Sequence, residues 1–123
     1  MISVDSSGWI EWFTGGPKAA DYDRVISSVR PGELVTSVVV LYEVYRKMKK
    51  LKGEETALEA IAALGETKVV PIDQTLSLEA ADYSLEHNLH FADALIYATA
   101  RSASAPLYTS DGELRSLKDV VFV

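Results

Sequence analysis

The strongest constraint on the fold of this chain is an alternation between short, largely apolar runs and longer amphipathic segments. The runs are Ile2–Val4, Leu34–Val35, Val69–Ile72, Leu107–Tyr108 and Val120–Val123. The segments between them cover residues 18–29, 37–52, 54–65, 75–87 and 91–103. Strands that alternate with helices of this length favour crossover connections and a parallel sheet covered on both faces. The pattern therefore predicts an α/β fold: a three-layer α/β/α sandwich with a mostly parallel, Rossmann-like sheet of about five strands.

The segment 37–52 is the clearest predicted helix. Its apolar residues follow the three-four spacing of one buried stripe: Leu41, Val44, Tyr45, Met48 and Leu51. Ser37 is suited to cap its start, and Gly53 to end it. Pro71 lies inside a strand-like run but cannot donate a hydrogen bond to a sheet, which predicts that this strand lies at an edge.

Length and composition limit the class of protein. The chain has 123 residues, so we expect one domain over 1–123, and 48% apolar with 24% charged residues is typical of a globular chain. No apolar run approaches the length of a membrane-spanning helix, and the N-terminus lacks the basic region of a signal peptide. There is no cysteine, which excludes disulfides and thiolate metal sites. We therefore expect a cytoplasmic protein without a membrane partner.

The net charge of −6 argues against a simple electrostatic binder of nucleic acid. This conclusion depends on where the acids lie. Asp5 and Asp111 each follow a predicted strand, and ligands of open parallel sheets bind beyond the carboxyl ends of strands, where the strand order reverses. Asp73 also follows a strand, but Pro71 places that strand at an edge.

Two further acids, Glu43 and Asp93, lie in otherwise apolar helical segments. A carboxylate among apolar residues is unfavourable unless it is paired or bound to a metal. Carboxylates that converge at one sheet edge repel each other without a cation. Because hard divalent ions prefer oxygen ligands, we expect Mg²⁺ or Mn²⁺ at this edge.

Four short motifs resemble those of the PIN domain family, in the same order and spacing and over essentially the whole chain. They are Asp5-Ser6-Ser7 after the first strand, Glu43 on the long helix, Asp93-Ala94-Leu95, and Thr109-Ser110-Asp111. The compact length is similar to that of VapC toxins from toxin–antitoxin pairs. Leu114 departs from the family pattern, in which an aromatic residue is common at this position.

The resemblance implies a metal-dependent endoribonuclease that cuts single-stranded RNA and leaves a 5′-phosphate and a 3′-hydroxyl. Asp5 and Asp93 match the acids that hold the metal most directly, and Glu43 and Asp111 match those that complete the pocket. Ser6 and Thr109 match small hydroxyl residues that orient carboxylates. A bound metal activates water and neutralises charge on the leaving oxygen, by one ion or by two. With these four acids on a metal, fourteen acidic residues remain against twelve basic ones, so the net charge no longer argues against RNA.

Each acid also has a simpler structural interpretation. Asp5 is suited to cap a helix, Asp93 to stabilise a helix N-terminus, and Asp111 before a glycine to form a turn. Glu43 has the spacing for an ordinary ion pair with Lys47. The basic residues Arg46, Lys47 and Lys50 fit either RNA contact or a solvated helix face.

Two other functions compete with the toxin interpretation. A phospho-acceptor receiver domain has a similar length and pattern, but it requires paired acids after the first strand and a lysine after the fifth, and this sequence has neither. A PIN-fold RNA-processing nuclease without an antitoxin has the same motifs. The resemblance also implies a VapB-like antitoxin and a homodimer. Core packing is the first interpretation of the apolar group Trp9, Trp12 and Phe13, and part of the group is a candidate dimer surface.

Overall fold

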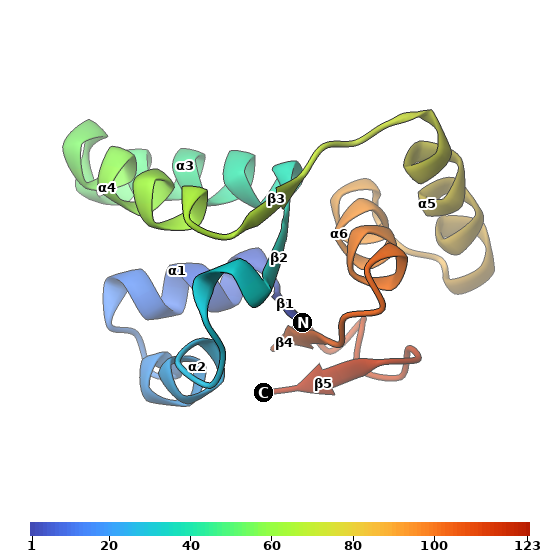
Figure 1. The fold of residues 1–123 in the computed structure, drawn as a ribbon, viewed down its shortest axis with the longest axis horizontal. Helices are drawn as coiled ribbons and strands as arrows, with labels where there is room; N and C mark the ends of the chain where they lie inside the picture. Colours follow the sequence, from blue (N-terminus) through green and yellow to red (C-terminus); the bar gives the residue numbers. More distant parts are fainter.

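The computed structural model describes residues 1–123 and contains five strands and six α-helices, in the order in which Figure 1 labels them. The strands are β1 (Ile2–Val4), β2 (Leu34–Ser37), β3 (Lys68–Val70), β4 (Leu107–Thr109) and β5 (Val120–Phe122). The helices are α1 (Ser6–Thr14), α2 (Ala19–Ile26), α3 (Val38–Lys52), α4 (Glu54–Gly65), α5 (Gln74–His87) and α6 (Phe91–Ser102). A 3-10 turn, Pro31–Glu33, precedes β2. No helix has the length and apolar character needed to cross a membrane.

The five strands form one sheet in the order β3-β2-β1-β4-β5, and every neighbouring pair is parallel. The chain builds outward from β1 to β3 and then returns to add β4 and β5 on the other side of β1. The strand order therefore reverses between β1 and β4, which is where ligands bind in open α/β sheets. The predicted parallel, Rossmann-like sheet and the edge position of the strand before Pro71 are both confirmed.

Helices cover both sides of the sheet (Figure 1). The α1–α2 pair and the α3–α4 hairpin lie on one side, and α5 and α6 lie on the other. This distribution follows from right-handed crossovers, since the connections after β1 and β2 run in one direction across the sheet and the connection after β3 runs back. The three-layer sandwich predicted from the alternation of runs is confirmed.

The buried stripe of α3 differs from the one predicted. Val40, Val44 and Met48 are buried, whereas Leu51 is 54% exposed. The α3–α4 hairpin extends beyond the sheet (Figure 1), so the last turn of α3 has no sheet to pack against. Ser37 does cap the helix by accepting a hydrogen bond from the Val39 amide at 3.2 Å, and Gly53 ends it with a φ of 93°.

The structure also shows how the N-terminal aromatic group packs. Trp9 is only 2% exposed and stacks against Phe13, with ring centroids 5.9 Å apart, while Trp12 meets Trp9 edge to face. The indole N–H of Trp12 donates to Asp23 on α2 at 2.9 Å. Trp9 therefore belongs to the core of the monomer, as the core-packing interpretation predicted, and only Trp12 and Phe13, which are partly exposed, remain candidates for a dimer surface.

Candidate active site

Asp5 lies at the carboxyl end of β1 and is almost fully buried, with 4% exposure. One carboxylate oxygen accepts a hydrogen bond from the Ser6 amide at 2.8 Å, at the start of α1. The other accepts from the Thr109 hydroxyl, also at 2.8 Å, at the end of β4. Asp5 therefore caps α1, as its simpler interpretation predicted, and it also joins the two strands between which the sheet order reverses. Burial raises the pKa of Asp5, and the two hydrogen bonds only partly offset this effect.

Thr109 connects Asp5 to Asp111. Its hydroxyl donates to Asp5 and accepts from the backbone amide of Asp111 at 3.0 Å. The Asp111 carboxylate accepts from the backbone amide of Glu113 at 2.9 Å, which is the turn interaction expected for an aspartate before a glycine. Because that bond occupies only one carboxylate oxygen, the other is free to face a ligand.

A buried tyrosine, Tyr22, contacts the loop that joins Thr109 to Asp111. The Tyr22 side chain is fully buried, and its hydroxyl lies 2.6 Å from that of Ser110, the residue between Thr109 and Asp111. The ring of Tyr22 occupies the space above Gly8, where a Cβ atom would lie 2.3 Å from the ring. A side chain at position 8 would therefore displace the tyrosine from the loop. Sequence analysis did not identify this contact.

Glu43 lies on α3, more than a turn after the Ser37 cap. Burial raises its pKa, the negative charge of Asp5 raises it further, and a hydrogen bond with the Ser6 side chain partly offsets both effects. No ion pair forms between Glu43 and Lys47. The helix-surface interpretation of Glu43 is therefore not supported, and this acid lies near Asp5 instead.

Asp93 lies in the first turn of α6, on the opposite side of the sheet from Glu43. Its pKa is raised from 3.8 to about 6. Burial is the largest cause, followed by the negative charges of Asp5, Asp111 and Glu43. The charges of three acids distant in the chain thus act on the carboxyl group of Asp93, so the four acids selected from the sequence lie in one region of the structure. Asp93 and Asp111 belong to a group of carboxylate oxygens within 4.8 Å of one another, whereas Asp5 and Glu43 belong to no such group.

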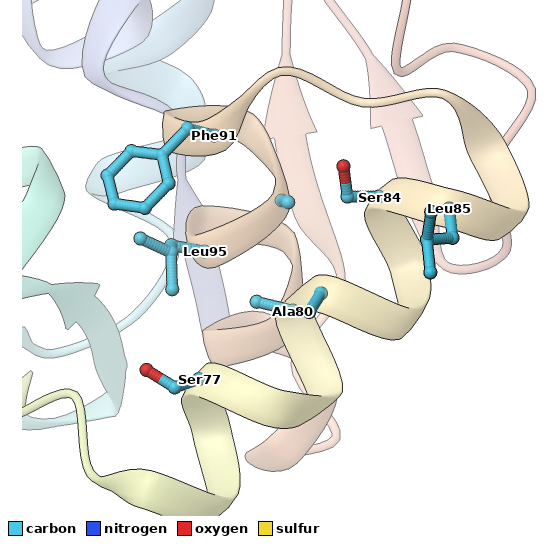
Figure 2. A pocket seen from close by; sticks show the side chains of 8 residues that line it. Ser77, Ala80, Ser84, Leu85, Phe91 and Leu95 are labelled. Atoms are coloured by element: carbon cyan, nitrogen blue, oxygen red, sulfur yellow. The ribbon is translucent and has the colours of Figure 1, made fainter.

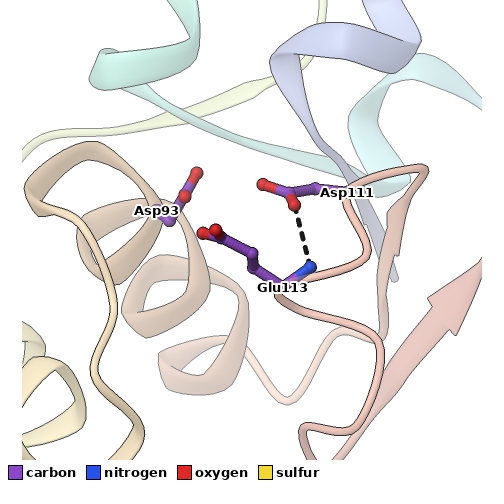
Figure 3. Close-up of side chains that lie close together, drawn as sticks. All are labelled: Asp93, Asp111 and Glu113. Carbon is purple, nitrogen blue, oxygen red and sulfur yellow. Dashed lines mark hydrogen bonds between the residues drawn. The ribbon is translucent and has the colours of Figure 1, made fainter.

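Glu113 is an acid of this region that sequence analysis missed. Single carboxylate oxygens of Asp93, Asp111 and Glu113 all lie within 4.8 Å of one another, and Figure 3 shows the three side chains converging from α6 and the loop after β4. Glu113 is exposed and also lies 3.5 Å from the ring of His90. The only sequence signal was its position two residues after Asp111.

The residues of this pocket fit a hard divalent cation. Every acidic donor in it is a carboxylate oxygen, the ligand type that Mg²⁺ and Mn²⁺ prefer. Burial and the neighbouring acids raise the pKa values of Asp5, Glu43 and Asp93, and the one positive charge of the protein that lowers any of them is that of His90, which acts on Asp93. A bound cation would add positive charge here.

The basic residues of α3 lie beside the pocket. Arg46, Lys47 and Lys50 are exposed. Ser6, Glu43, Arg46 and Lys47 line the same groove, of about 420 Å³, so two positive side chains adjoin Glu43, while Lys50 lines a neighbouring groove.

A separate groove between α5 and α6 has a different character (Figure 2). It measures about 450 Å³, and its walls include Ala80 and Leu85 on α5 and Phe91 and Leu95 on α6. No acidic or basic side chain lines it, so it offers no groups for phosphodiester chemistry.

Comparison with known proteins connects this geometry to a family. A family profile described as PIN domain matches residues 2–120. No curated protein sequence matches significantly. Among solved structures, a toxin–antitoxin complex from Klebsiella pneumoniae is similar with a TM-score of 0.85 and 22% identity, covering 98% of this chain and 96% of that one.

Two further structures have the same architecture. VapC20 of Mycobacterium tuberculosis, a toxin that cleaves the sarcin-ricin loop, has a TM-score of 0.79 and 22% identity, with 98% of both chains covered. VapBC2 of Rickettsia felis, bound to a DNA fragment from its promoter, has a TM-score of 0.74 and 14% identity, covering 100% of this chain and 98% of that one. At these identities the similarity establishes a shared fold over the whole chain.

Proposed function

This chain belongs to the PIN domain family, and from that premise we propose that it is a Mg²⁺- or Mn²⁺-dependent endoribonuclease, the toxin of a VapBC-type pair. The proposal depends above all on one observation. Carboxylate oxygens of Asp93, Asp111 and Glu113 lie within 4.8 Å of one another at the switch point of the sheet, and the charges of Asp5 and Glu43 also act on Asp93. Such a pocket is suited to a divalent cation and to the phosphodiester group of RNA.

Within this proposal the four acids have distinct tasks. Asp5 and Asp93 hold the ion most directly, while Glu43 and Asp111 complete its surroundings. Ser6 and Thr109 keep the carboxylate of Asp5 in one orientation through their hydrogen bonds. A bound Mg²⁺ or Mn²⁺ supplies Lewis-acid chemistry, which polarises water and neutralises charge on the phosphate.

The positive side chains of α3 support an RNA substrate. Arg46 and Lys47 share a groove with Glu43, and Lys50 lines the next groove along α3, where these cations can bind the phosphates that flank the cut and steer the RNA toward the acids. They also offset the repulsion that an acidic protein exerts on a polyanion.

The proposed partner is a small VapB-like antitoxin. Several similar structures are toxin–antitoxin complexes, including those from Klebsiella pneumoniae and Rickettsia felis. An arginine of the antitoxin, inserted among the four acids, would replace the cation electrostatically and bond a carboxylate through two parallel hydrogen bonds. A homodimer is also proposed, on a surface other than the buried Trp9.

The proposal is tested with purified protein and a labelled single-stranded RNA. We expect cleavage with Mg²⁺ or Mn²⁺, none with EDTA, and products that carry a 5′-phosphate. Failure to cleave any of several unrelated RNAs with either ion would contradict the nuclease assignment.

The antitoxin is tested by co-expression with the product of the adjacent gene. A stable complex with suppressed cleavage is the expected result. If the protein cleaves RNA but forms no such complex, it is an RNA-processing nuclease rather than a toxin.

A further inference from the structure

Two exposed aromatic side chains border the acidic pocket. Tyr42, 67% exposed, directly precedes Glu43 on α3, and Phe91, 82% exposed, lies two residues before Asp93 at the start of α6. Exposed rings of this size have no role in packing the core. Each lies within two residues of one of the proposed catalytic acids.

A groove of about 360 Å³ connects the two rings. Tyr42 and Phe91 line it together with Val38, Val39 and Ala92, and Glu43 supplies its one acidic group. The groove is thus apolar, bordered by aromatic rings, and opens beside a carboxylate of the pocket. Its chemistry suits a flat, largely apolar group next to the reacting phosphate.

Tyr42 also borders two basic grooves on α3. One contains Ser6, Glu43, Arg46 and Lys47, and the other contains Tyr45, Arg46, Lys49 and Lys50. Residues 42, 46, 49 and 50 lie on one face of the helix by their three-four spacing. Tyr42 is therefore located where an apolar groove meets a positively charged one.

The cations of these grooves are largely uncompensated. Arg46, Lys47 and Lys50 form no ion pair, while Lys49 lies 3.6 Å from Glu54. Unpaired cations next to an exposed ring complement a ligand with both negative charge and flat apolar faces. Unpaired nucleotides have this combination, since phosphates bind Lys and Arg while bases stack on aromatic side chains.

We propose that Tyr42 is a stacking platform for one unpaired base of the RNA, next to the phosphate that is cut, with Phe91 as the opposite wall of the base-binding groove. This inference rests on the proposed ribonuclease function and names the feature of the substrate that this site recognises. It assigns the groove to a base and the cations Arg46, Lys47 and Lys50 to the backbone. Tyr42 is a substrate-binding residue and takes no part in bond cleavage.

The test compares two ligands in EDTA, where no cleavage occurs. One is a fluorescein-labelled eight-nucleotide single-stranded RNA of mixed sequence, and the other is a strand of the same length and charge without bases. Fluorescence anisotropy gives Kd for the parent, Tyr42→Ala, Tyr42→Phe and Phe91→Ala. Leu51→Ala is the matched control, an exposed apolar residue on the same helix outside these grooves, and Leu85→Ala controls for the α5–α6 groove that Phe91 also lines.

Tyr42→Ala should weaken binding of the RNA with bases by about tenfold and leave binding of the abasic strand unchanged. Tyr42→Phe should bind both strands as the parent does, because it keeps the ring. Phe91→Ala should show the same selective loss, while Leu51→Ala and Leu85→Ala bind like the parent. Because Tyr42 is exposed, its replacement should leave the fold intact, which circular dichroism verifies.

Equal loss of both ligands, or loss of neither, would overturn the inference. So would a change in sedimentation from dimer to monomer without a change in RNA binding, which would assign Tyr42 to a protein interface. Parent cleavage with Mg²⁺ is measured in parallel. If the parent cleaves but Tyr42→Ala binds normally, only the stacking platform fails; if the parent neither binds nor cleaves RNA, both proposals fail.

Discussion

The four acids of the pocket divide into two pairs that the fold holds in different ways. Asp5 and Asp111 follow β1 and β4 and are fixed by hydrogen bonds that pass through Thr109. Glu43 and Asp93 come from helices on opposite sides of the sheet, and Asp93 forms no hydrogen bond through its carboxylate. The strand pair, Asp5 and Asp111, is thus organised by hydrogen bonds of the protein. The charge of the helix pair, Glu43 and Asp93, is offset only by Ser6 at Glu43 and by His90 at Asp93. Because the pKa values of both helix acids remain raised, we expect the helix pair to depend most on a cation.

The largest expected effect is on activity, and both pairs should show it. Asp5→Asn and Asp93→Asn should each reduce cleavage by more than about 100-fold, since loss of a metal ligand exceeds the effect of losing a supporting residue. The measurement is single-turnover cleavage of labelled RNA with Mg²⁺. Asp82→Asn, the same change at an exposed acid of α5, is the control and should cleave like the parent.

Added metal should raise the Tm of the parent, and this increase should depend on Asp93, a member of the helix pair. Binding to the native state alone stabilises the parent by about 2.7 kcal/mol at a hundredfold excess over Kd. For a domain of this size, Tm should rise by roughly 5–10 °C. Asp93→Asn should lose much of this increase, and Asp82→Asn should keep it. A parent protein whose Tm does not change at millimolar Mg²⁺ or Mn²⁺ would contradict the cation site.

Without metal, the two pairs should respond to substitution in opposite directions. Thr109→Val keeps the shape of the side chain but leaves the buried Asp5 carboxylate and the Asp111 amide without a partner, at a cost of about 2 kcal/mol. Asp93→Asn removes a repelled charge and should melt at or above the parent in EDTA. Thermal melts in EDTA distinguish these cases; destabilisation by Asp93→Asn would indicate that Asp93 acts only as a helix-end charge.

The stability of the protein should depend on pH through Asp93, a member of the helix pair. The native pKa of Asp93, about 6, lies above its unfolded value of 3.8. The native state therefore binds this proton more tightly than the unfolded state does. The stability gained in this way is fully present below pH 3.8 and is lost as the pH rises through about 6. Because Asp93 is only half-buried, solvent screening limits the effect to a few degrees in Tm. The difference in Tm between Asp93→Asn and the parent in EDTA should be larger at pH 7.5 than at pH 4.5. An equal difference at both pH values would contradict a raised pKa of Asp93.

The contrast between the pairs also explains what the sequence could predict. Asp5 and Asp111 were identified from topology, because they follow strands that flank the reversal of strand order. Glu43 and Asp93 were identified because acids in apolar helical segments require compensation. Both arguments use local sequence and a general rule of sheet architecture.

The features that were missed depend on three-dimensional packing. Helix α1 was indicated only by the capping position of Asp5 and not by an amphipathic pattern, since Ser6, Ser7 and Gly8 are weak helix formers and the helix is stabilised by burial of Trp9. The contact of Tyr22 with Ser110 joins residues 88 positions apart, which no local pattern reveals. Glu113 approaches Asp93 only because the loop after β4 turns back toward α6 (Figure 3).

The central claim is that four acids from separate elements share one electrostatic pocket, and the pKa of Asp93 measures this directly. The measurement is an NMR titration of the Asp93 carboxyl carbon in metal-free protein, repeated in Glu43→Gln, Asp111→Asn and the control Asp82→Asn. We expect a pKa of about 6 in the parent and in Asp82→Asn, and a lower value in each of the other two variants. A pKa near 3.8 in the parent, or one that does not change in Glu43→Gln and Asp111→Asn, would contradict the shared pocket.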